Sequence, residues 1–322
     1  MTQRGKDACA IARAHVLTSL SRHEVPPLGR CALVGTGSNL AGVQLGRRID
    51  EHDSVIRVNR LSTTTFAADV GVRTSIYFKN QLTELVASGA RARVKVRHLG
   101  ATVDSKRNDT KDWCDLVEGG AACAFDALVY EGALDAGQRW PSDGPLAAAR
   151  FTTARQSDAL LLFQSQVLGL GRAVPPFGGD ERVFAVRATA GAKAFFTFAL
   201  LCDSLTLFGF GGRGTIDRHG MRVKRVEAAG GKSNTVEVTL RHGHDYEAEH
   251  SFLRRVARGQ LKERDLPHDM PSWWSLNVSA RGAAKPQHRA IPVRSEFAHL
   301  ARSLVCRARA RRIRMYEGST VL

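Results

Sequence analysis

The sequence CALVGTGSNLAGVQLGRRIDEHDSVIRVN, from Cys31 to Asn59, decides the fold class. CALV is a short apolar run that predicts a buried strand, and GTGSN follows it as a glycine-rich turn. LAGVQLGRRIDEH has helical spacing, with Ser38 or Asn39 as its N-cap, and SVIRVN predicts a second strand. Strand, turn, helix and strand in this order begin a doubly wound α/β sheet.

The rest of the chain continues this alternation of strands and helices. Apolar runs predict further strands at 74–78, 94–100, 126–132, 204–210, 235–240 and 311–316. Helical patterns predict helices within 1–30 and at 158–171, 190–203, 249–258 and 295–310. The resulting division is an N-terminal helical extension at 1–30, a catalytic domain at 31–258, an irregular insertion at 259–300 and a C-terminal helix and strand at 301–322.

Composition restricts the possible partners. The chain has 322 residues and a formal net charge of +16, which favours anionic partners such as sugar nucleotides or acidic glycans. Aromatic residues make up only 7%, which is low for base stacking, and no nucleic-acid motif occurs, so nucleic acid is not an expected partner. No apolar run reaches the length of a membrane span, and no secretory signal is present. The six cysteines contain no CxxC pair, so no metal is expected.

The GTGSN turn has more than one interpretation. Its backbone amides and the helix that follows favour a phosphate or nucleotide site, while a tight turn without a ligand is the simpler alternative. An NADP-dependent oxidoreductase is a second functional hypothesis, with Arg60 near the cofactor. Leu40 stands where a dinucleotide turn needs its third glycine, and Asn59 stands where an acid is expected, so the dinucleotide pattern is incomplete.

The same stretch resembles the large sialyl motif of the sialyltransferases (glycosyltransferase family 29). The residues in register with that motif are Cys31, Gly35, Asn39, Leu40, Ile49, Asp50, His52, Arg57 and Asn59. ATAGAKAFFTFALLCDSLTLFGFG, from Ala188 to Gly211, resembles the small sialyl motif, with Thr189 and Cys202 at the family spacing. His219 falls at the histidine of the third motif, and His244 with Glu249 matches the His-x-x-x-x-Glu of the last one.

The resemblance implies a sialyltransferase-like variant of the GT-A fold and an inverting, metal-independent glycosyl transfer. The donor would be CMP-sialic acid, or the CMP derivative of a related 3-deoxy acid such as Kdo, and the acceptor a glycan hydroxyl. A catalytically weakened, sialyltransferase-like binding protein is the remaining alternative, because Thr36, Ala190, Leu200 and Gly220 depart from the family pattern. No cofactor is implied.

The residue roles follow from the motif matches. His244 would be the general base that takes the acceptor proton, and His219 would donate to the leaving phosphate. Glu249 would support the helix or the histidine. The donor would be bound by Gly35, Thr36, Gly37, Ser38, Asn39, Asn59, Thr189, Ala190 and Gly191.

The family also pairs the cysteines that correspond to Cys31 and Cys202, so a disulfide is expected between them. Both precede or begin predicted parallel strands, which would bring them to the same end of the sheet. A disulfide and two glycosylation sequons, at Asn108 and Asn277, fit a glycoprotein of the Golgi lumen, the location typical of the family. Membrane association would then depend on an anchor N-terminal to this chain.

Overall fold

The computed structural model describes sixteen segments of the chain. The described residues are 9–19, 25–58, 63, 66–79, 85–86, 93–94, 127–130, 152–168, 173–174, 184–185, 188–211, 214–216, 223–225, 245–267, 294–317 and 319–322.

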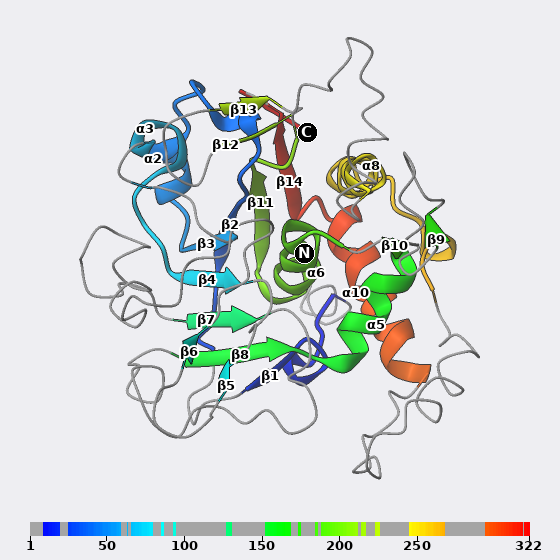
Figure 1. The fold of residues 1–322 in the computed structure, drawn as a ribbon. Coiled ribbons are helices and arrows are strands. Elements are labelled where there is room, and N and C mark those ends of the chain that lie inside the picture. The colour runs from blue at the N-terminus through cyan, green and yellow to red at the C-terminus, as the bar shows by residue number, and fades with distance from the viewer. Residues whose placement is uncertain are drawn as a thin grey trace.

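A nine-stranded sheet forms the centre of the fold, in the order β1-β8-β7-β4-β3-β2-β11-β14-β15 (Figure 1). Every neighbouring pair from β8 to β14 is parallel. The parallel strands are β8 (Thr152–Gln156), β7 (Ala127–Tyr130), β4 (Ile76–Lys79), β3 (Ser54–Val58), β2 (Arg30–Val34), β11 (Ser204–Phe208) and β14 (Ile313–Glu317).

Antiparallel strands close both edges of the sheet. β1 (Leu17–Ser19) pairs with β8, and β15 (Thr320–Val321) pairs with β14. Three short two-stranded ribbons lie outside the main sheet. They are β5 (Leu85–Val86) with β6 (Arg93–Val94), β9 (Ala173–Val174) with β10 (Phe184–Ala185), and β12 (Gly214–Ile216) with β13 (Val223–Arg225).

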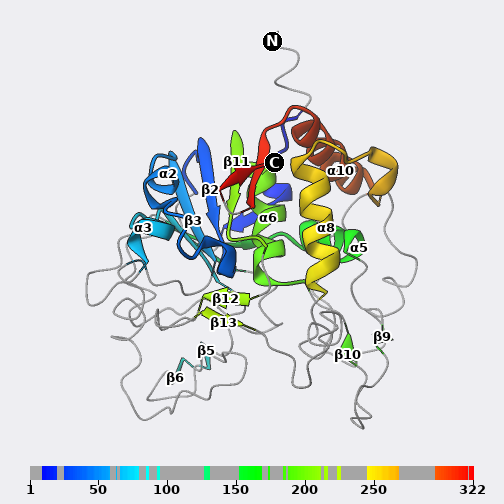
Figure 2. The same cartoon turned by 90° about the horizontal axis from the view of Figure 1, so that it is seen from above.

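Helices cover both faces of the sheet, so the molecule has three layers (Figure 2). One face carries the short helices α2 (Gly46–Asp50) and α3 (Ala67–Val70), and the other carries four longer ones. These are α5 (Asp158–Val167), α6 (Ala190–Leu201), α8 (Tyr246–Ala257) and α10 (Arg294–Arg309); the 3₁₀ turns are η1 (Arg13–His15), η2 (Ser38–Leu40) and η3 (Glu263–Asp265). This confirms the expected doubly wound, mostly parallel α/β sheet.

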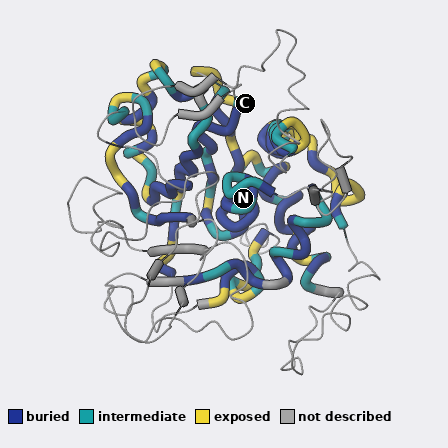
Figure 3. The backbone as a smooth tube through the Cα atoms, viewed as in Figure 1, coloured by how far each residue is buried: buried dark blue, intermediate teal, exposed yellow. Residues whose placement is uncertain are grey.

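The two faces bury hydrophobic cores of different size. The larger core packs α5, α6, α8 and α10 on the sheet, and α6 lies at its centre because its side chains from Phe195 to Leu200 are all buried. The smaller core holds Ile49 of α2, Val70 of α3 and Phe208 of β11. Figure 3 shows the buried residues concentrated in the central strands and on the inner sides of the helices. Helices on both faces explain why the central strands are apolar without alternation.

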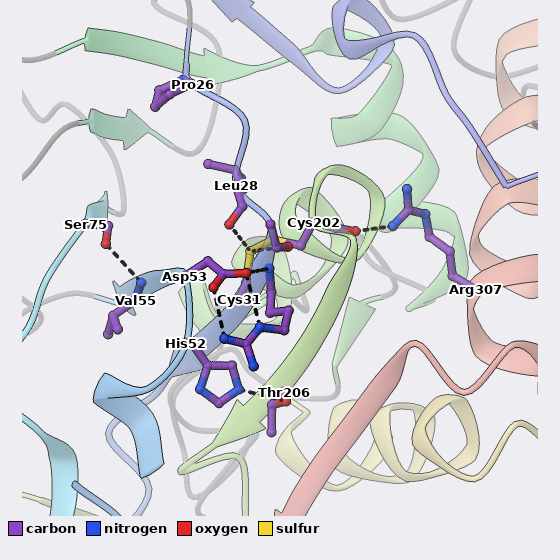
Figure 4. The surroundings of a disulfide bond; sticks show 12 residues. Pro26, Leu28, Cys31, His52, Asp53, Val55, Ser75, Cys202, Thr206 and Arg307 are labelled. Atoms are coloured by element: carbon purple, nitrogen blue, oxygen red, sulfur yellow. Dashed lines mark hydrogen bonds and ion pairs between the residues drawn. A yellow bond between two sulfur atoms is a disulfide. The ribbon is translucent and has the colours of Figure 1, made fainter. Parts of the chain in front are cut away.

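Two disulfides fasten the larger core. Cys31 of β2 is bonded to Cys202, which follows α6, with 6.0 Å between their Cα atoms, and this confirms the expected pair (Figure 4). Cys9 is bonded to Cys306 of α10 across 297 residues of sequence. The buried Arg307 donates hydrogen bonds to the backbone carbonyls of Cys9 and Cys202, so one side chain connects both bridges.

The helical extension expected within residues 1–30 is wrong for the part described. Residues from Arg13 form one 3₁₀ turn, and Leu17 begins an edge strand. The adjacent side chains of Val16 and Leu17 are both buried, and Ser157 holds the backbone of His15 and Val16 through two hydrogen bonds. Pairing with β8 therefore satisfies this segment better than an isolated helix would.

The boundary expected at residue 300 also moves. α10 already begins at Arg294, so residues 294–300 are helical rather than irregular. Residues 259–267 are the described part of the expected insertion, and in them Leu261 and Leu266 are buried in the larger core. The rest of the expected insertion, residues 268–293, lies outside the described residues, as does the strand expected at 235–240.

Candidate functional site

The strand order reverses between β2 and β11. From β2 the chain adds β3, β4, β7 and β8 on one side, and it later adds β11 and β14 on the other. Such a reversal leaves a crevice at the carboxyl ends of the two central strands, where open α/β sheets bind ligands. Here those ends are Val34 and Phe208, which are paired in register. The expected donor-binding turn starts one residue later, at Gly35.

The turn after β2 packs closely on the turn after β11. The amide of Gly35 donates to the carbonyl of Phe208 at 2.8 Å, and that of Gly37 donates to Gly209 at 3.0 Å. A Cβ atom at Gly37 would lie 2.4 Å from the Gly209 carbonyl oxygen and 2.6 Å from that of Gly211. Glycine is therefore required at position 37 because two backbone segments meet there.

Thr36 and Asn39 are half-buried on either side of this contact, and Ser38 begins the turn η2. The side-chain oxygen Oδ1 of Asn39 is buried and has no hydrogen-bond partner among the described residues. A buried amide oxygen without a partner carries a desolvation cost that a ligand donor would offset. The donor-binding role expected for Asn39 stays a prediction.

Neither Ser38 nor Asn39 caps a helix, so that expectation is wrong. The helix expected from Leu40 begins only at Gly46. Gly42 and Gln44 have φ angles of 77° and 54°, which break helical backbone, and the carboxylate of Asp69 accepts from both of their amides.

The N-terminus of α6 forms the opposite side of the candidate site. Thr189 is its N-cap, with Oγ1 accepting from the amide of Ala192 at 3.0 Å. The Phe210 side chain lies between this helix and the first turn: a Cβ at Gly191 would be 3.0 Å from Phe210 Cε1, and one at Gly35 would be 3.3 Å from Cε2. The two motif segments expected to share a site, 35–39 and 189–191, therefore meet around one ring. Ala190 lies between Thr189 and Gly191 and is half-buried.

Sequence reasoning assigned no role to Phe210. It is an aromatic residue two positions after the end of β11, at the switch point of the sheet, and that position was the available signal.

Glu249 of α8 is the most buried carboxylate of the site, with 4% of its surface exposed. Its oxygens accept from the Thr189 amide at 2.7 Å and from the Thr189 hydroxyl at 2.6 Å. Burial raises the pKa of Glu249 to about 7, although both hydrogen bonds from Thr189 oppose the shift. Glu249 therefore binds Thr189, the N-cap residue of α6. Such a contact is one way in which Glu249 would support the helix.

Other residues of the large motif hold the fold together. Asp50 accepts from the amides of Val72 and Arg73, which fixes the turn before β4. His52 Nε2 lies 3.2 Å from the Thr206 hydroxyl and joins the segment after α2 to β11 (Figure 4). Arg57 is buried and donates to the carbonyl of Arg73 and to Thr74. Asp50, His52 and Arg57 therefore have structural roles, because each connects two segments of the fold.

Three expected site residues, Asn59, His219 and His244, lie outside the described residues. In the sequence, His244 directly precedes Asp245, whose side chain accepts from Ala248 as the N-cap of α8. Among the described residues, no group of three or more His, Cys, Asp or Glu side chains is arranged to hold a metal ion. Within the same part of the chain, no helix is long and apolar enough to cross a membrane.

Comparison with known proteins identifies the relatives of this chain. Residues 10–107 match the model of Glycosyltransferase family 29 (sialyltransferase). Human β-galactoside α-2,6-sialyltransferase 1 is 46% identical over 59 residues, which are 18% of this chain and 14% of that protein. Sialyltransferase-like protein 2 of Oryza sativa subsp. indica is 29% identical over 242 residues, 69% of this chain and 51% of that protein.

A solved mammalian sialyltransferase aligns with 74% of this chain and 72% of its own, at 18% identity and a TM-score of 0.38. The chain spans about half or less of the length of the two curated relatives described above. The sequence matches confirm the resemblance that the motifs indicated: the chain is similar in sequence to sialyltransferases of glycosyltransferase family 29.

Proposed function

We propose that this protein is a glycosyltransferase that moves sialic acid, or a related 3-deoxy acid such as Kdo, from its CMP donor to a glycan hydroxyl. The observation that carries the proposal is the meeting of the Gly35–Asn39 turn and the α6 N-terminus around Phe210, at the switch point of the sheet. Both segments resemble sialyl motifs, and the first of them lies within residues 10–107, which match the family model.

In this mechanism, backbone amides bind the phosphate of the CMP-sugar. CMP carries one phosphate, so a glycine-rich turn and the start of a helix supply enough amides to bind it without a metal ion. The partnerless oxygen of Asn39 would accept from a donor group of the ligand, such as a ribose hydroxyl or the cytosine amino group. Asn59, which follows β3 in the sequence, would add a second amide.

The acceptor side uses histidine chemistry. His244 would remove the proton from the acceptor hydroxyl as the bond to the sugar forms, and His219 would donate to the phosphate oxygen that gains charge as CMP leaves. Attack opposite the leaving CMP inverts the configuration of the sugar carbon. The motif matches of the two histidines support these roles.

The two disulfides favour a location in an oxidising compartment, and we propose that this compartment is the Golgi lumen. Cys31–Cys202 and Cys9–Cys306 both cross-link the larger core, and such bonds persist in secretory compartments rather than in the cytosol. The acceptor would then be a glycan on a glycoprotein, glycolipid or polysaccharide in that lumen.

Thermal unfolding with added nucleotides tests the proposal. We expect CMP to raise the melting temperature, by an amount that corresponds to about 2.7 kcal/mol at a hundredfold excess over its dissociation constant. NADP is the matched comparison, because the oxidoreductase hypothesis predicts the opposite ranking. Stabilisation by NADP without stabilisation by CMP would refute the proposed function. Incubation with CMP-sialic acid and CMP-Kdo, each with a galactoside acceptor, then separates the two donors.

A further inference from the structure

The hydrogen bonds of Thr189 are arranged so that one proton decides what its hydroxyl does. Oγ1 accepts from the amide of Ala192 and donates its own hydrogen to Glu249 Oε2. With Glu249 ionised, the hydroxyl hydrogen is used inside the protein and is not available to a ligand. A carboxylate accepts only, so the direction of this bond is fixed while the charge is present.

A neutral Glu249 reverses that bond. A carboxylic acid has one O–H donor, and its nearest partner is Thr189 Oγ1, 2.6 Å from Oε2. Oγ1 can accept from both Glu249 and Ala192 because a hydroxyl oxygen has two lone pairs. The amide of Thr189 keeps Oε1 as its acceptor at 2.7 Å, so the carboxyl group stays in place. The hydrogen of the Thr189 hydroxyl is then free.

We propose that Glu249 is a proton-sensitive positioning residue, which frees the Thr189 hydroxyl for an anionic ligand at the α6 N-terminus when it becomes neutral. The inference rests on the proposed function, because the ligand is the phosphate of the CMP donor. Loss of the negative charge of Glu249 also favours binding of the anionic ligand, as the freed hydroxyl does. A buried carboxylate beside the first turn of α6 offsets the positive end of the helix dipole and repels a phosphate.

The surroundings of Glu249 allow this change near neutral pH. Burial raises its pKa to about 7. The charged and titratable groups that act on it among the described residues are Asp245, which raises its pKa, and Lys193 of α6, which lowers it. The remaining neighbour is Tyr246, whose own pKa is raised by burial and then by the charge of Glu249. Tyr246 stays neutral at such pH, so Glu249 is the group that responds.

Titration of CMP against pH tests the inference. Glu249→Gln mimics the neutral acid, because its amide nitrogen donates where the acid hydroxyl would. From pH 8 to pH 6, we expect the affinity of the wild type for CMP to rise about tenfold more than that of Glu249→Gln. Titration of CMP itself and of the histidines affects both proteins equally. Glu247→Gln, on the exposed side of the same helical turn, is the matched control and should follow the wild type.

Three results are distinguishable. A steeper pH dependence in the wild type than in Glu249→Gln supports the switch, and parallel profiles with good CMP binding overturn it while leaving the proposed function intact. Absence of CMP binding in both proteins at every pH overturns the proposed function and this inference with it.

A ligand-free measurement covers the case in which Glu249→Gln folds poorly. The folded pKa of Glu249 lies above its ordinary value of 4.5, so the native state holds the proton more tightly between 4.5 and about 7. The contribution of Glu249 to the free energy of unfolding is therefore fully present below pH 4.5, and it is lost as the pH rises toward 7. Infrared spectra of the wild type should show a buried protonated carboxyl at pH 6 that disappears as the pH rises through about 7; its absence at pH 6 overturns the inference.

Discussion

At Gly37, the spacing between two backbone segments leaves no room for a methyl group. Its Cβ would meet the carbonyl oxygens of Gly209 and Gly211, neither of which can rotate away. We therefore expect Gly37→Ala to lower the free energy of unfolding by about 1–3 kcal/mol and to weaken CMP binding. Gly211→Ala is the matched control, because its nearest neighbour is the flexible side chain of Asn39 at 3.4 Å. Equal losses of stability in the two variants, measured by denaturant unfolding, would contradict this explanation.

Single histidines should control the chemical step. His244→Ala is expected to reduce the turnover number by roughly 100-fold, the usual scale for losing a general base, while CMP affinity changes little. His219→Ala should reduce turnover and also weaken CMP binding, because its partner is the phosphate. Steady-state kinetics beside CMP titrations separate the two patterns. Full turnover in His244→Ala would exclude it as the base.

At the scale of elements, α6 is fixed to the sheet by a buried polar network. Gln156 of β8 donates to the hydroxyl of Thr197 at 2.7 Å and to the carbonyl of Lys193 at 3.0 Å, and it exchanges longer hydrogen bonds with Gln164 of α5. All three glutamine and threonine side chains are almost completely buried. The network sets the position of the helix whose first turn forms the candidate site.

Thr197→Val should show what this network contributes. The substitution keeps the shape of the side chain but removes the shortest of the three hydrogen bonds that Gln156 Nε2 makes, and the net loss of one such bond costs about 0.5–1.5 kcal/mol. Thr197→Ser keeps the hydroxyl and loses only a methyl group, so it serves as the control. Urea unfolding of both variants provides the comparison; a larger loss in Thr197→Ser would mean that packing, not hydrogen bonding, holds α6.

Buried strands could be predicted from the sequence because their apolar runs are continuous. β2, β3 and β11 lie where CALV, SVIRV and SLTLF predicted them. The helix after β2 could not be placed, because its apolar spacing gave no sign that Asp69, more than twenty residues away, accepts from Gly42 and Gln44. Likewise, the edge strand β1 depends on a tertiary partner, β8, that local periodicity does not reveal.

The sequence predicted that two segments of the candidate site lie together, but it did not predict their contacts. The motifs indicated that residues 35–39 and 189–191 belong together, and the structure brings them around Phe210. The sequence did not show that the Thr189 hydroxyl is already bonded to Glu249, since a hydrogen bond over 60 residues has no local pattern. The parts played by Asn59, His219 and His244 remain predictions.

At the scale of the whole molecule, the two disulfides join distant parts of the chain to one core. Cys31 and Cys202 could be paired from the family motifs, but Cys9 and Cys306 could not, because no spacing rule connects cysteines at the two ends of a chain. Arg307 bridges them: burial lowers the pKa of its guanidinium, and its hydrogen bonds to Cys9 and Cys202 compensate for that burial.

Removing each disulfide should have a similar effect on stability and a different effect on binding. In the chain-entropy model, loops of 171 and 297 residues both give about 5–6 kcal/mol, because the dependence on length is logarithmic. Only Cys31–Cys202 joins β2 to the α6–β11 connection. The candidate site lies at the other ends of β2, α6 and β11, so this disulfide acts on the site by holding the three elements together. The double variant Cys31→Ala/Cys202→Ala should therefore lose stability and bind CMP more weakly, while Cys9→Ala/Cys306→Ala should lose stability and bind CMP as the wild type does. Denaturant unfolding and CMP titration of both double variants make the test. Unchanged CMP affinity in folded Cys31→Ala/Cys202→Ala protein would show that strand pairing alone positions the site.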